Sequence, residues 1–335
     1  QYEVTWGSQA IRDGLAKKHF HFTGQKIDPD KNIVVTCGST EAMMASMLTV
    51  CNPGEKVIVF SPFYENYSAD AILSSAQPIF VPLNPPDFTF DPNVLEEAFK
   101  QGPKAIIVCN PSNPSGRVFT ESELKIIADL AVKYDTFVIT DEVYEHIVYK
   151  PYKHVYFSTL PGMRERTITC NSLSKTYSIT GWRLGYVVAE DYIIDRVKKV
   201  HDFLTVGAAA PLQEAVVTAL NFDDSYYDEL LNIYTDRKNL FINGLKNMDF
   251  DYTDPQGAYY VMVNVGKYGV TDDIKFCEWM AREVGVGAVP GSSFFNENIN
   301  NYVRFHFAKS RETLTEALNR LETLDKKALN AKGCF

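Results

Sequence analysis

Short apolar runs alternate with amphipathic stretches between residues 33 and 170. The apolar runs predict strands at residues 33–37, 56–60, 79–83, 105–109, 137–140 and 167–170. Helices are expected between several of these strands, for example over residues 41–50. This alternation favours a mostly parallel sheet with helices on both faces. Pro82 has no backbone N–H to donate, so the strand at 79–83 is expected near an edge of the sheet.

Two segments carry local signals for where regular structure begins and ends. Thr120 is followed three residues later by Glu123, a capping box that predicts the start of a helix running to Val132. Residues 110–116 hold two Asn-Pro pairs and a glycine, so they are expected to form a rigid loop outside helix and sheet. This loop follows directly on the strand at 105–109.

The C-terminal part of the chain predicts a second domain. A long helix is expected over residues 225–246, with one face formed by Tyr226, Leu230, Ile233, Leu240 and Leu245. Strands are expected near residues 258–263 and 302–307. We therefore predict a large domain at 1–225, a small domain at 226–328 and a tail at 329–335.

A final amphipathic helix is expected after Ser310, which is a typical N-cap residue. One side of this helix carries Leu314, Leu318 and Leu321. Leu321 and Leu324 are expected to be core contacts, whereas the chain from Lys326 on is expected to fray.

Composition and charge exclude several classes of protein. The formal net charge of −9 argues against nucleic acid as the main partner. No apolar run approaches the roughly 20 residues of a membrane span. Asp141-Glu142 follows a strand, but the GxxxxGK[ST] loop of an ATPase is missing from the sequence. Residues 285–291 do not match the GxGxxG pattern of nicotinamide-binding folds.

The six cysteines show no CxxC spacing. Cys37, Cys109 and Cys170 fall in or at the ends of apolar runs, as buried free thiols do. Free thiols persist in a reducing compartment, so a cytoplasmic location is expected.

Two stretches carry candidate chemistry. Gly38-Ser39-Thr40 joins the first strand to a helix, and the free N–H groups and positive dipole end of such a helix favour an anion. Lys175 follows the strand at 167–170, at the edge where ligands bind in α/β sheets. A lysine kept neutral at such a place can condense with an aldehyde.

The stretch Ser172-Leu173-Ser174-Lys175, followed by Gly181-Trp182-Arg183, resembles the cofactor-lysine motif of fold type I, pyridoxal phosphate (PLP) dependent aminotransferases of class I/II. The resemblance covers essentially the whole chain. It is greatest to the subgroup of aromatic, kynurenine, methionine, alanine and some aspartate aminotransferases. It implies an α/β fold, with a mostly parallel seven-stranded sheet in the large domain and a smaller α+β C-terminal domain.

The resemblance also assigns roles around the cofactor ring. Lys175 matches the catalytic lysine that holds the PLP aldehyde, and Asp141 matches the acid that pairs with the ring nitrogen. A carboxylate there favours the protonated ring, which withdraws electrons. Tyr144 matches the tyrosine that hydrogen-bonds the phenolic oxygen, and Tyr64 matches the aromatic residue that stacks on the ring.

Substrate and phosphate contacts follow from the same resemblance. Asn113 matches an asparagine that contacts the phenolic oxygen and the substrate carboxylate, and Arg304 matches the arginine that clamps that carboxylate. Phosphate contacts are implied for Ser39, Thr40, Ser172 and Arg183. Tyr2 matches a tyrosine that reaches the phosphate of the partner subunit, so a homodimer with shared active sites is implied.

The implied activity is transfer of an amino group from an L-amino acid to a 2-oxo acid. Some aspartate-specific members have a lysine where this chain has Thr40, so a neutral or aromatic amino donor is favoured. Three alternatives stay open: an aspartate aminotransferase, a PLP-dependent C–S β-lyase, and a non-catalytic regulatory PLP-binding domain. Family members usually carry a few dozen more residues before the segment that matches Gln1-Tyr2, so a trimmed or partial chain is expected.

Overall fold

The computed structural model describes residues 2–330, which form two sheets of different kinds. The larger sheet has seven strands in the order β1-β7-β6-β5-β4-β2-β3. Neighbours from β3 to β6 pair in parallel, whereas β7 runs antiparallel to both β6 and β1. The strands are β1 (Ile33–Thr36), β2 (Lys56–Ser61), β3 (Gln77–Pro82), β4 (Ala105–Cys109), β5 (Phe137–Asp141), β6 (Thr167–Ser172) and β7 (Gly185–Val188). The predicted seven-stranded, mostly parallel sheet is confirmed.

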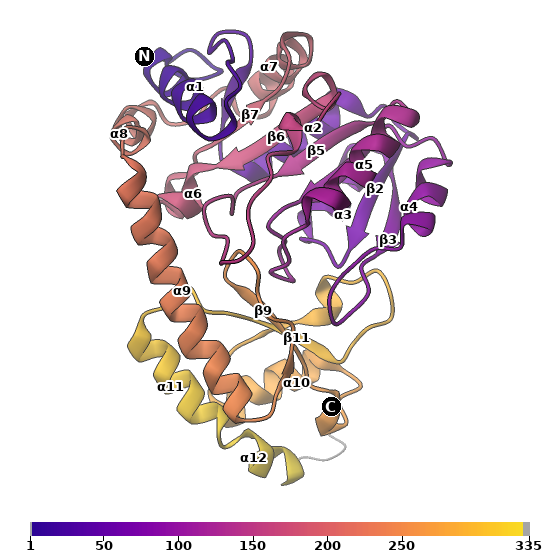
Figure 1. Cartoon of the computed structure of the whole chain (residues 1–335), viewed down its shortest axis with the longest axis vertical. Coiled ribbons are helices and arrows are strands. Elements are labelled where there is room, and N and C mark those ends of the chain that lie inside the picture. The colour runs from indigo at the N-terminus through magenta and orange to yellow at the C-terminus, as the bar shows by residue number, and fades with distance from the viewer. Residues whose placement is uncertain (1, 331–335) are drawn as a thin grey trace.

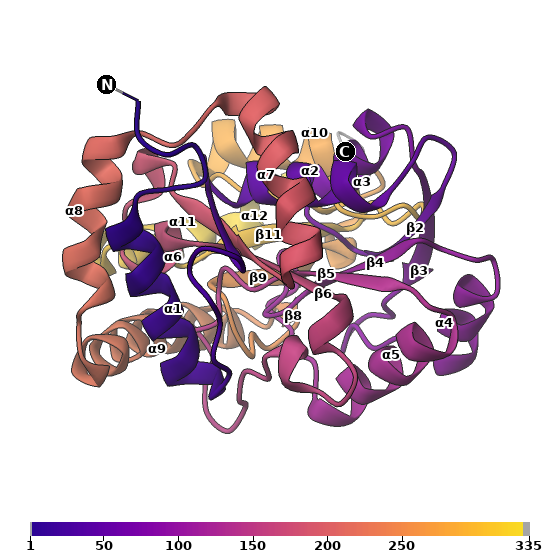
Figure 2. The same cartoon turned by 90° about the horizontal axis from the view of Figure 1, so that it is seen from above.

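Helices cover both faces of this sheet. Successive residues of a strand point to opposite faces, so one strand contributes apolar side chains to both helical layers. Ile58 and Phe60 pack with α4 (Pro92–Phe99) and α5 (Glu121–Lys133). Val57 and Val59 pack on the other face with α2 (Ser39–Val50), α3 (Asn66–Leu73) and α7 (Asp191–Thr205). Figure 2 shows these two helical layers on opposite sides of the strands.

The end of the sheet at β1 and β7 is covered by two further helices. α1 (Gln9–Thr23) and α8 (Ala210–Leu220) contribute Ile11, Leu15, Val216 and Leu220 to one cluster with Ile33 and Val35 of β1. The short helix α6 (Leu173–Thr176) follows β6 directly.

The smaller sheet has four antiparallel strands in the order β10-β11-β9-β8. These are β8 (Asp251–Tyr252), β9 (Tyr260–Asn264), β10 (Val289–Pro290) and β11 (Tyr302–His306). Helices α9 (Asp224–Asn247), α10 (Asp273–Trp279), α11 (Arg311–Leu321) and α12 (Leu324–Asn330) surround this sheet. Figure 1 shows α9 running from the large domain at the top of the view to the small domain below it.

Most local predictions agree with the structure. The Thr120–Glu123 capping box is present, and Ser310 caps α11 by accepting a hydrogen bond from the N–H of Thr313. The strand that contains Pro82 lies at the sheet edge. β7 is a strand that the apolar pattern did not predict, because it is short and follows directly on the Gly181–Arg183 turn.

Two predictions are wrong in part. Ile233 is exposed, and its neighbour Tyr234 is buried in its place, where its ring stacks on Tyr259 with the centroids 5.6 Å apart. The segment from Lys326 to Asn330 does not fray, because it belongs to α12, which buries Ala328 in the core. Residues 331–335 of the predicted tail lie outside the described residues. The domain boundary near residue 225 stays a prediction; it falls in the first turn of α9.

Within residues 2–330, no helix combines the length and apolar character that crossing a membrane requires.

Candidate active site

Most of the predicted site residues line one cavity at the carboxyl ends of the parallel strands. Asp141 ends β5, Lys175 lies in α6 after β6, and Asn113 lies in the loop after β4. Ligands bind at this edge of open α/β sheets. The cavity measures about 190 Å³. The predicted residues in its lining are Ser39, Thr40, Tyr64, Asn113, Asp141, Tyr144, Ser172, Lys175 and Arg183.

Lys175 is half-buried in this cavity. Ser172 caps the helix that carries it, since the Ser172 Oγ accepts a hydrogen bond from the N–H of Ser174 at 3.0 Å. Burial lowers the pKa of Lys175, and the Arg183 guanidinium lowers it further, whereas Asp141 opposes the shift. A lowered pKa leaves more of the amine neutral at a given pH, and the neutral amine is the nucleophile.

Asp141 is a buried carboxylate with a specific hydrogen-bond partner. The Tyr67 hydroxyl donates to Asp141 Oδ2 at 2.6 Å, and the Val143 N–H lies 3.4 Å from Oδ1. Burial raises the pKa of Asp141, while the contacts from Tyr67 and Val143 lower it. The hydrogen bonds therefore support an ionised carboxylate at a place where burial alone disfavours one.

The first turn of α2 is shaped by two glycines and one arginine. Gly38 has a φ of +87°, and a Cβ added to it would meet Arg183 Nη2 at 2.5 Å. A Cβ on Gly185 would meet the carbonyl carbon of Gly38 at 2.4 Å. A side chain at Gly38 would therefore displace the guanidinium, and one at Gly185 would push β7 away from the turn. The N-terminus of α2 has no side-chain cap, so its first N–H groups are available to an anion.

The Ser174 hydroxyl adds a further donor to the same cavity. It is buried, lines the cavity and has no hydrogen-bond partner among the described residues. Buried hydroxyls are nearly always paired, so an orphan in this place fits an oxygen-rich ligand. The donor set of Arg183, the α2 N-terminus and Ser174 fits the phosphate of PLP, while Lys175 fits its aldehyde and Asp141 its ring nitrogen.

Arg304 of β11 is not part of the cavity lining, but it contacts Asn113 and Tyr260, which are. Its Nη1 donates to Asn113 Oδ1 at 2.6 Å. The guanidinium lies between the rings of Tyr260 and Phe294, with Cζ 4.4 Å from each ring centroid. The hydroxyls of Tyr260 and Tyr144 are hydrogen-bonded at 2.9 Å. Arg304 is thus held in one orientation beside residues that line the cavity.

Tyr2 lies outside the cavity lining, and its side chain is 91% exposed. Thr40, Thr180 and Arg183 are also exposed in the single chain, although all three line the cavity. The predicted contact of Tyr2 with a partner subunit stays a prediction.

The sequence analysis did not identify Tyr67, Ser174, Thr180 and Tyr260 as site residues, yet all four line the cavity. Tyr67 had a usable signal, because it follows Tyr64 by only three residues; the turn that leads into α3 brings the two rings edge to face, with centroids 5.7 Å apart. Ser174 lies within the lysine motif itself. Tyr260 comes from the small domain, and nothing in its local sequence marks it as part of this site.

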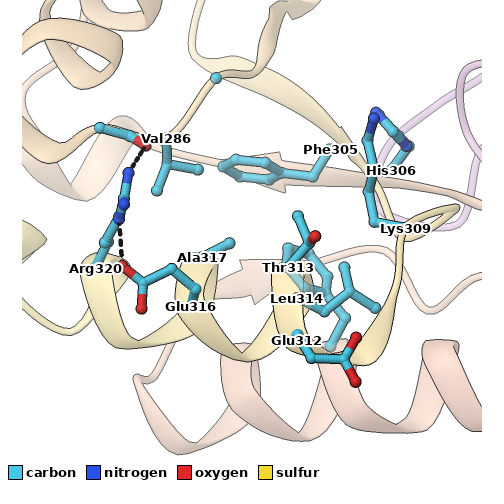
Figure 3. Close-up of a pocket in the computed structure, with 13 residues that line it drawn as sticks. Val286, Phe305, His306, Lys309, Glu312, Thr313, Leu314, Glu316, Ala317 and Arg320 are labelled. Atoms are coloured by element: carbon cyan, nitrogen blue, oxygen red, sulfur yellow. Dashed lines mark hydrogen bonds and ion pairs between the residues drawn. The ribbon is translucent and has the colours of Figure 1, made fainter.

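A larger cavity of about 540 Å³ lies in the small domain, between β11 and α11 (Figure 3). Phe305 and Leu314 are part of its lining, and Arg320 at one end donates to the Gly285 carbonyl and to Glu316 (Figure 3). None of the residues predicted to bind cofactor or substrate lines it. The volume of a cavity therefore does not mark the active site here; the convergence of chemical groups does.

Comparison with known proteins agrees with this geometry. Residues 1–321 match the family described as "Aminotransferase class I and II". The chain is 34% identical over 336 residues to the probable N-succinyldiaminopimelate aminotransferase DapC of Mycobacterium tuberculosis (strain CDC 1551 / Oshkosh), which covers 97% of this chain and 85% of that protein. It is 32% identical over 325 residues to the methionine aminotransferase of Escherichia coli (strain K12), which covers 97% of this chain and 84% of that protein.

Solved structures agree as well. The three-dimensional structure of N-succinyldiaminopimelate aminotransferase from Mycobacterium tuberculosis matches with a TM-score of 0.93 at 35% identity, covering 97% of this chain and 85% of that chain. The fold, the convergence of groups in one cavity and the family match lead to one conclusion. The chain belongs to the class I and II aminotransferases, and it is a PLP-dependent aminotransferase of fold type I.

Proposed function

We propose that this enzyme moves the amino group of a neutral or aromatic L-amino acid to a 2-oxo acid. One observation carries the choice of substrate. The charged residues in the cavity lining are Asp141, Lys175 and Arg183, and each is matched to a group of PLP. Within the described part of the chain, the lining therefore offers no further cation for a second substrate carboxylate. Thr40 contributes only a hydroxyl at the position that is lysine in some aspartate-specific members.

Arg304 is proposed to bind the α-carboxylate that every amino-acid substrate has. A planar guanidinium suits two-point contact with a carboxylate. The ring sandwich and the bond to Asn113 support this role, because they hold the guanidinium in place before substrate arrives. Asn113 is proposed to contact the same carboxylate and the phenolic oxygen of PLP.

We propose that PLP is held at three points. The phosphate would lie at the N-terminus of α2, where its contacts would be Ser39, Thr40, Ser172 and Arg183. The Ser174 hydroxyl, which has no partner among the described residues, is a further proposed contact. One carboxylate oxygen of Asp141 would accept a hydrogen bond from the ring nitrogen. The other oxygen, Oδ2, accepts a hydrogen bond from the Tyr67 hydroxyl. Tyr64 stacks on the ring, and Tyr144 contacts the phenolic oxygen.

When bound, PLP supplies an aldehyde that carries the amino group and a ring that withdraws electrons from the substrate Cα. The chain supplies the proton transfer. Lys175 Nζ would accept the proton from the substrate Cα as a general base. Its lowered pKa suits this role, because a protonated ammonium could not accept that proton.

A panel of amino donors tests the substrate proposal. Each donor is mixed with the holoenzyme, and the change in visible cofactor absorbance gives kcat/KM for the half-reaction. We expect phenylalanine and methionine to be used at least as well as aspartate. A preference for aspartate of more than about tenfold, or about 1.4 kcal/mol, would refute the neutral-substrate proposal.

A homodimer with shared active sites is also proposed. The patch formed by Phe203, Leu204 and Val206 at the end of α7 is exposed, with Phe203 91% exposed. An isologous interface between two copies would bury this apolar patch and cover the exposed phosphate end of the cavity. Light scattering combined with an activity assay checks the proposal, and a fully active monomer would contradict it.

A cytoplasmic location is proposed as well. Among the described residues, Cys37, Cys51, Cys109, Cys170 and Cys277 are all free thiols, which supports a reducing compartment. Imaging of a tagged chain in its native cells checks this location.

A further inference from the structure

A buried acid next to the predicted phosphate contacts has no part in the chemistry above. Glu41 is the third residue of α2, directly after Ser39 and Thr40. Its Oε2 accepts a hydrogen bond from the backbone N–H of Cys37 at 2.5 Å. The side chain of Glu41 therefore spans the turn Gly38–Thr40 and links its two ends.

The other oxygen of Glu41 is held from α7. The Thr205 hydroxyl donates to Glu41 Oε1 at 2.7 Å, and His201 Nδ1 lies 2.6 Å from the same oxygen. The second ring nitrogen, Nε2, lies 2.7 Å from the carbonyl oxygen of Thr5. His201 is fully buried, with a side-chain exposure of 0%.

These distances limit the protonation states that the Glu41–His201 pair can adopt. A carboxylate oxygen and a backbone carbonyl are both acceptors, so each ring nitrogen must carry a hydrogen to bond its partner. A neutral imidazole has only one N–H, so it could keep both contacts only if Glu41 carried the proton and donated it to Nδ1. Both contacts are satisfied when His201 is an imidazolium and Glu41 is ionised.

The neighbouring charges agree with this assignment. The Glu41 hydrogen bond and charge raise the pKa of His201 against burial, and Asp202 acts in the same direction. The hydrogen bonds and charge of His201 lower the pKa of Glu41 against burial. The remaining titratable neighbour is the Cys37 thiol, whose pKa is raised by burial and by Glu41 and lowered by Arg183.

We propose that Glu41 and protonated His201 are positioning residues for the turn that binds the PLP phosphate. This inference rests on the proposed phosphate contacts of Ser39, Thr40 and Arg183. Glu41 fixes the turn from within α2, and His201 fixes Glu41 from α7. His201 also ties down Thr5, three residues after Tyr2, so the same ion pair orders the segment proposed to reach the partner subunit.

The test compares PLP with pyridoxal, which lacks the phosphate. The full chain is stripped of cofactor, and the Kd of each ligand is measured by equilibrium dialysis. Both ligands use the aldehyde and the ring, so the ratio of the two Kd values isolates the phosphate contribution. Glu41→Gln should weaken PLP by about tenfold, the scale of one charge-assisted hydrogen bond, and leave pyridoxal unchanged.

Two matched variants separate the possible failures. Arg183→Lys should reduce the PLP advantage over pyridoxal; if it does not, the proposed phosphate contacts are wrong. If Arg183→Lys has this effect and Glu41→Gln does not, only the positioning role is overturned. Glu123→Gln removes the charge of another, partly buried ion pair, with Arg117, and should leave both Kd values unchanged. Equal weakening of PLP and pyridoxal by Glu41→Gln would show a general structural role and overturn the proposal.

The pH dependence of the wild type gives a second test that needs no foldable variant. The pKa of His201 is raised above its ordinary value of 6.5, so below that pH, while Glu41 stays ionised, the pair is intact, and it is lost as the pH rises through the raised pKa of His201. The PLP advantage over pyridoxal should therefore fall as the pH rises above 6.5. In His201→Gln the ratio should be low and constant over the same range. A wild-type ratio that does not fall with pH would overturn the role of the protonated ring.

Discussion

The hydroxyl of Tyr67 offers the sharpest single perturbation of the active site. Tyr67→Phe removes one oxygen atom and keeps the ring that packs in the core between α3 and the sheet. That oxygen donates to Asp141 Oδ2 at 2.6 Å, and both side chains are buried. The variant therefore changes the electrostatics of Asp141 with little change in packing.

The expected effect follows from the hydrogen bond. A hydrogen bond to a charged group contributes about 1.5–3 kcal/mol. Its loss makes ionised Asp141 less stable by that amount, which corresponds to about ten- to hundredfold in kcat if the reaction requires the carboxylate. The Tyr67 contact lowers the pKa of Asp141, so the variant has a higher Asp141 pKa than the wild type. The loss of kcat should consequently be largest at low pH and should recover partly as the pH rises.

The assay is a pH profile of kcat for one good amino donor in the wild type and in Tyr67→Phe. Tyr149→Phe is the matched control, because it removes a buried tyrosine hydroxyl that donates to the Ala258 carbonyl at 2.6 Å, outside the cavity lining. The control should keep the wild-type profile. The reasoning is refuted if Tyr67→Phe also keeps the wild-type profile, or if both variants lose the same activity at every pH.

Three further outcomes are expected. Borohydride reduction of the holoenzyme should fix PLP on the peptide that contains Lys175, and mass spectrometry that finds the label on another lysine would reject that assignment. Arg304→Gln should lower kcat/KM for all amino donors alike, by about 2–5 kcal/mol, because the buried substrate carboxylate loses its partner; losses that differ strongly between donors would contradict the clamp. Thr40→Lys should raise kcat/KM for aspartate relative to phenylalanine, since an added cation compensates a buried anion. An unchanged ratio would place Thr40 away from the distal end of the substrate.

Much of the site could be predicted because its residues lie in short local motifs. Lys175 and Arg183 belong to one continuous stretch, and Asp141 and Asn113 each follow a strand that the apolar pattern marks. Parallel strands end at one edge, so residues that follow them are brought together by the fold class alone. Tyr67 was missed because its partner is 74 residues away, and only the packing of α3 on the sheet brings the two side chains together.

The helices show the same division between features set by local sequence and features set by tertiary packing. The Thr120–Glu123 capping box and the Ser310 cap depend on residues within one helical turn, so the sequence alone predicts them. Whether Ile233 or Tyr234 of α9 is buried depends on Tyr259, which lies in the turn before β9 and stacks on Tyr234. A helical pattern limits which residues share a face, but the neighbouring elements decide which face is buried.

The sequence by itself therefore determined most of the strand and helix pattern and the mostly parallel sheet, because both depend on spacing along the chain, and its motifs carried the resemblance to PLP enzymes. Only the tertiary structure decided the surroundings of His201. Its two ring nitrogens meet Glu41 and Thr5, which are 160 and 196 residues away in the chain. A histidine has no fixed charge near neutral pH, and the acceptors placed around His201 by folding raise its pKa.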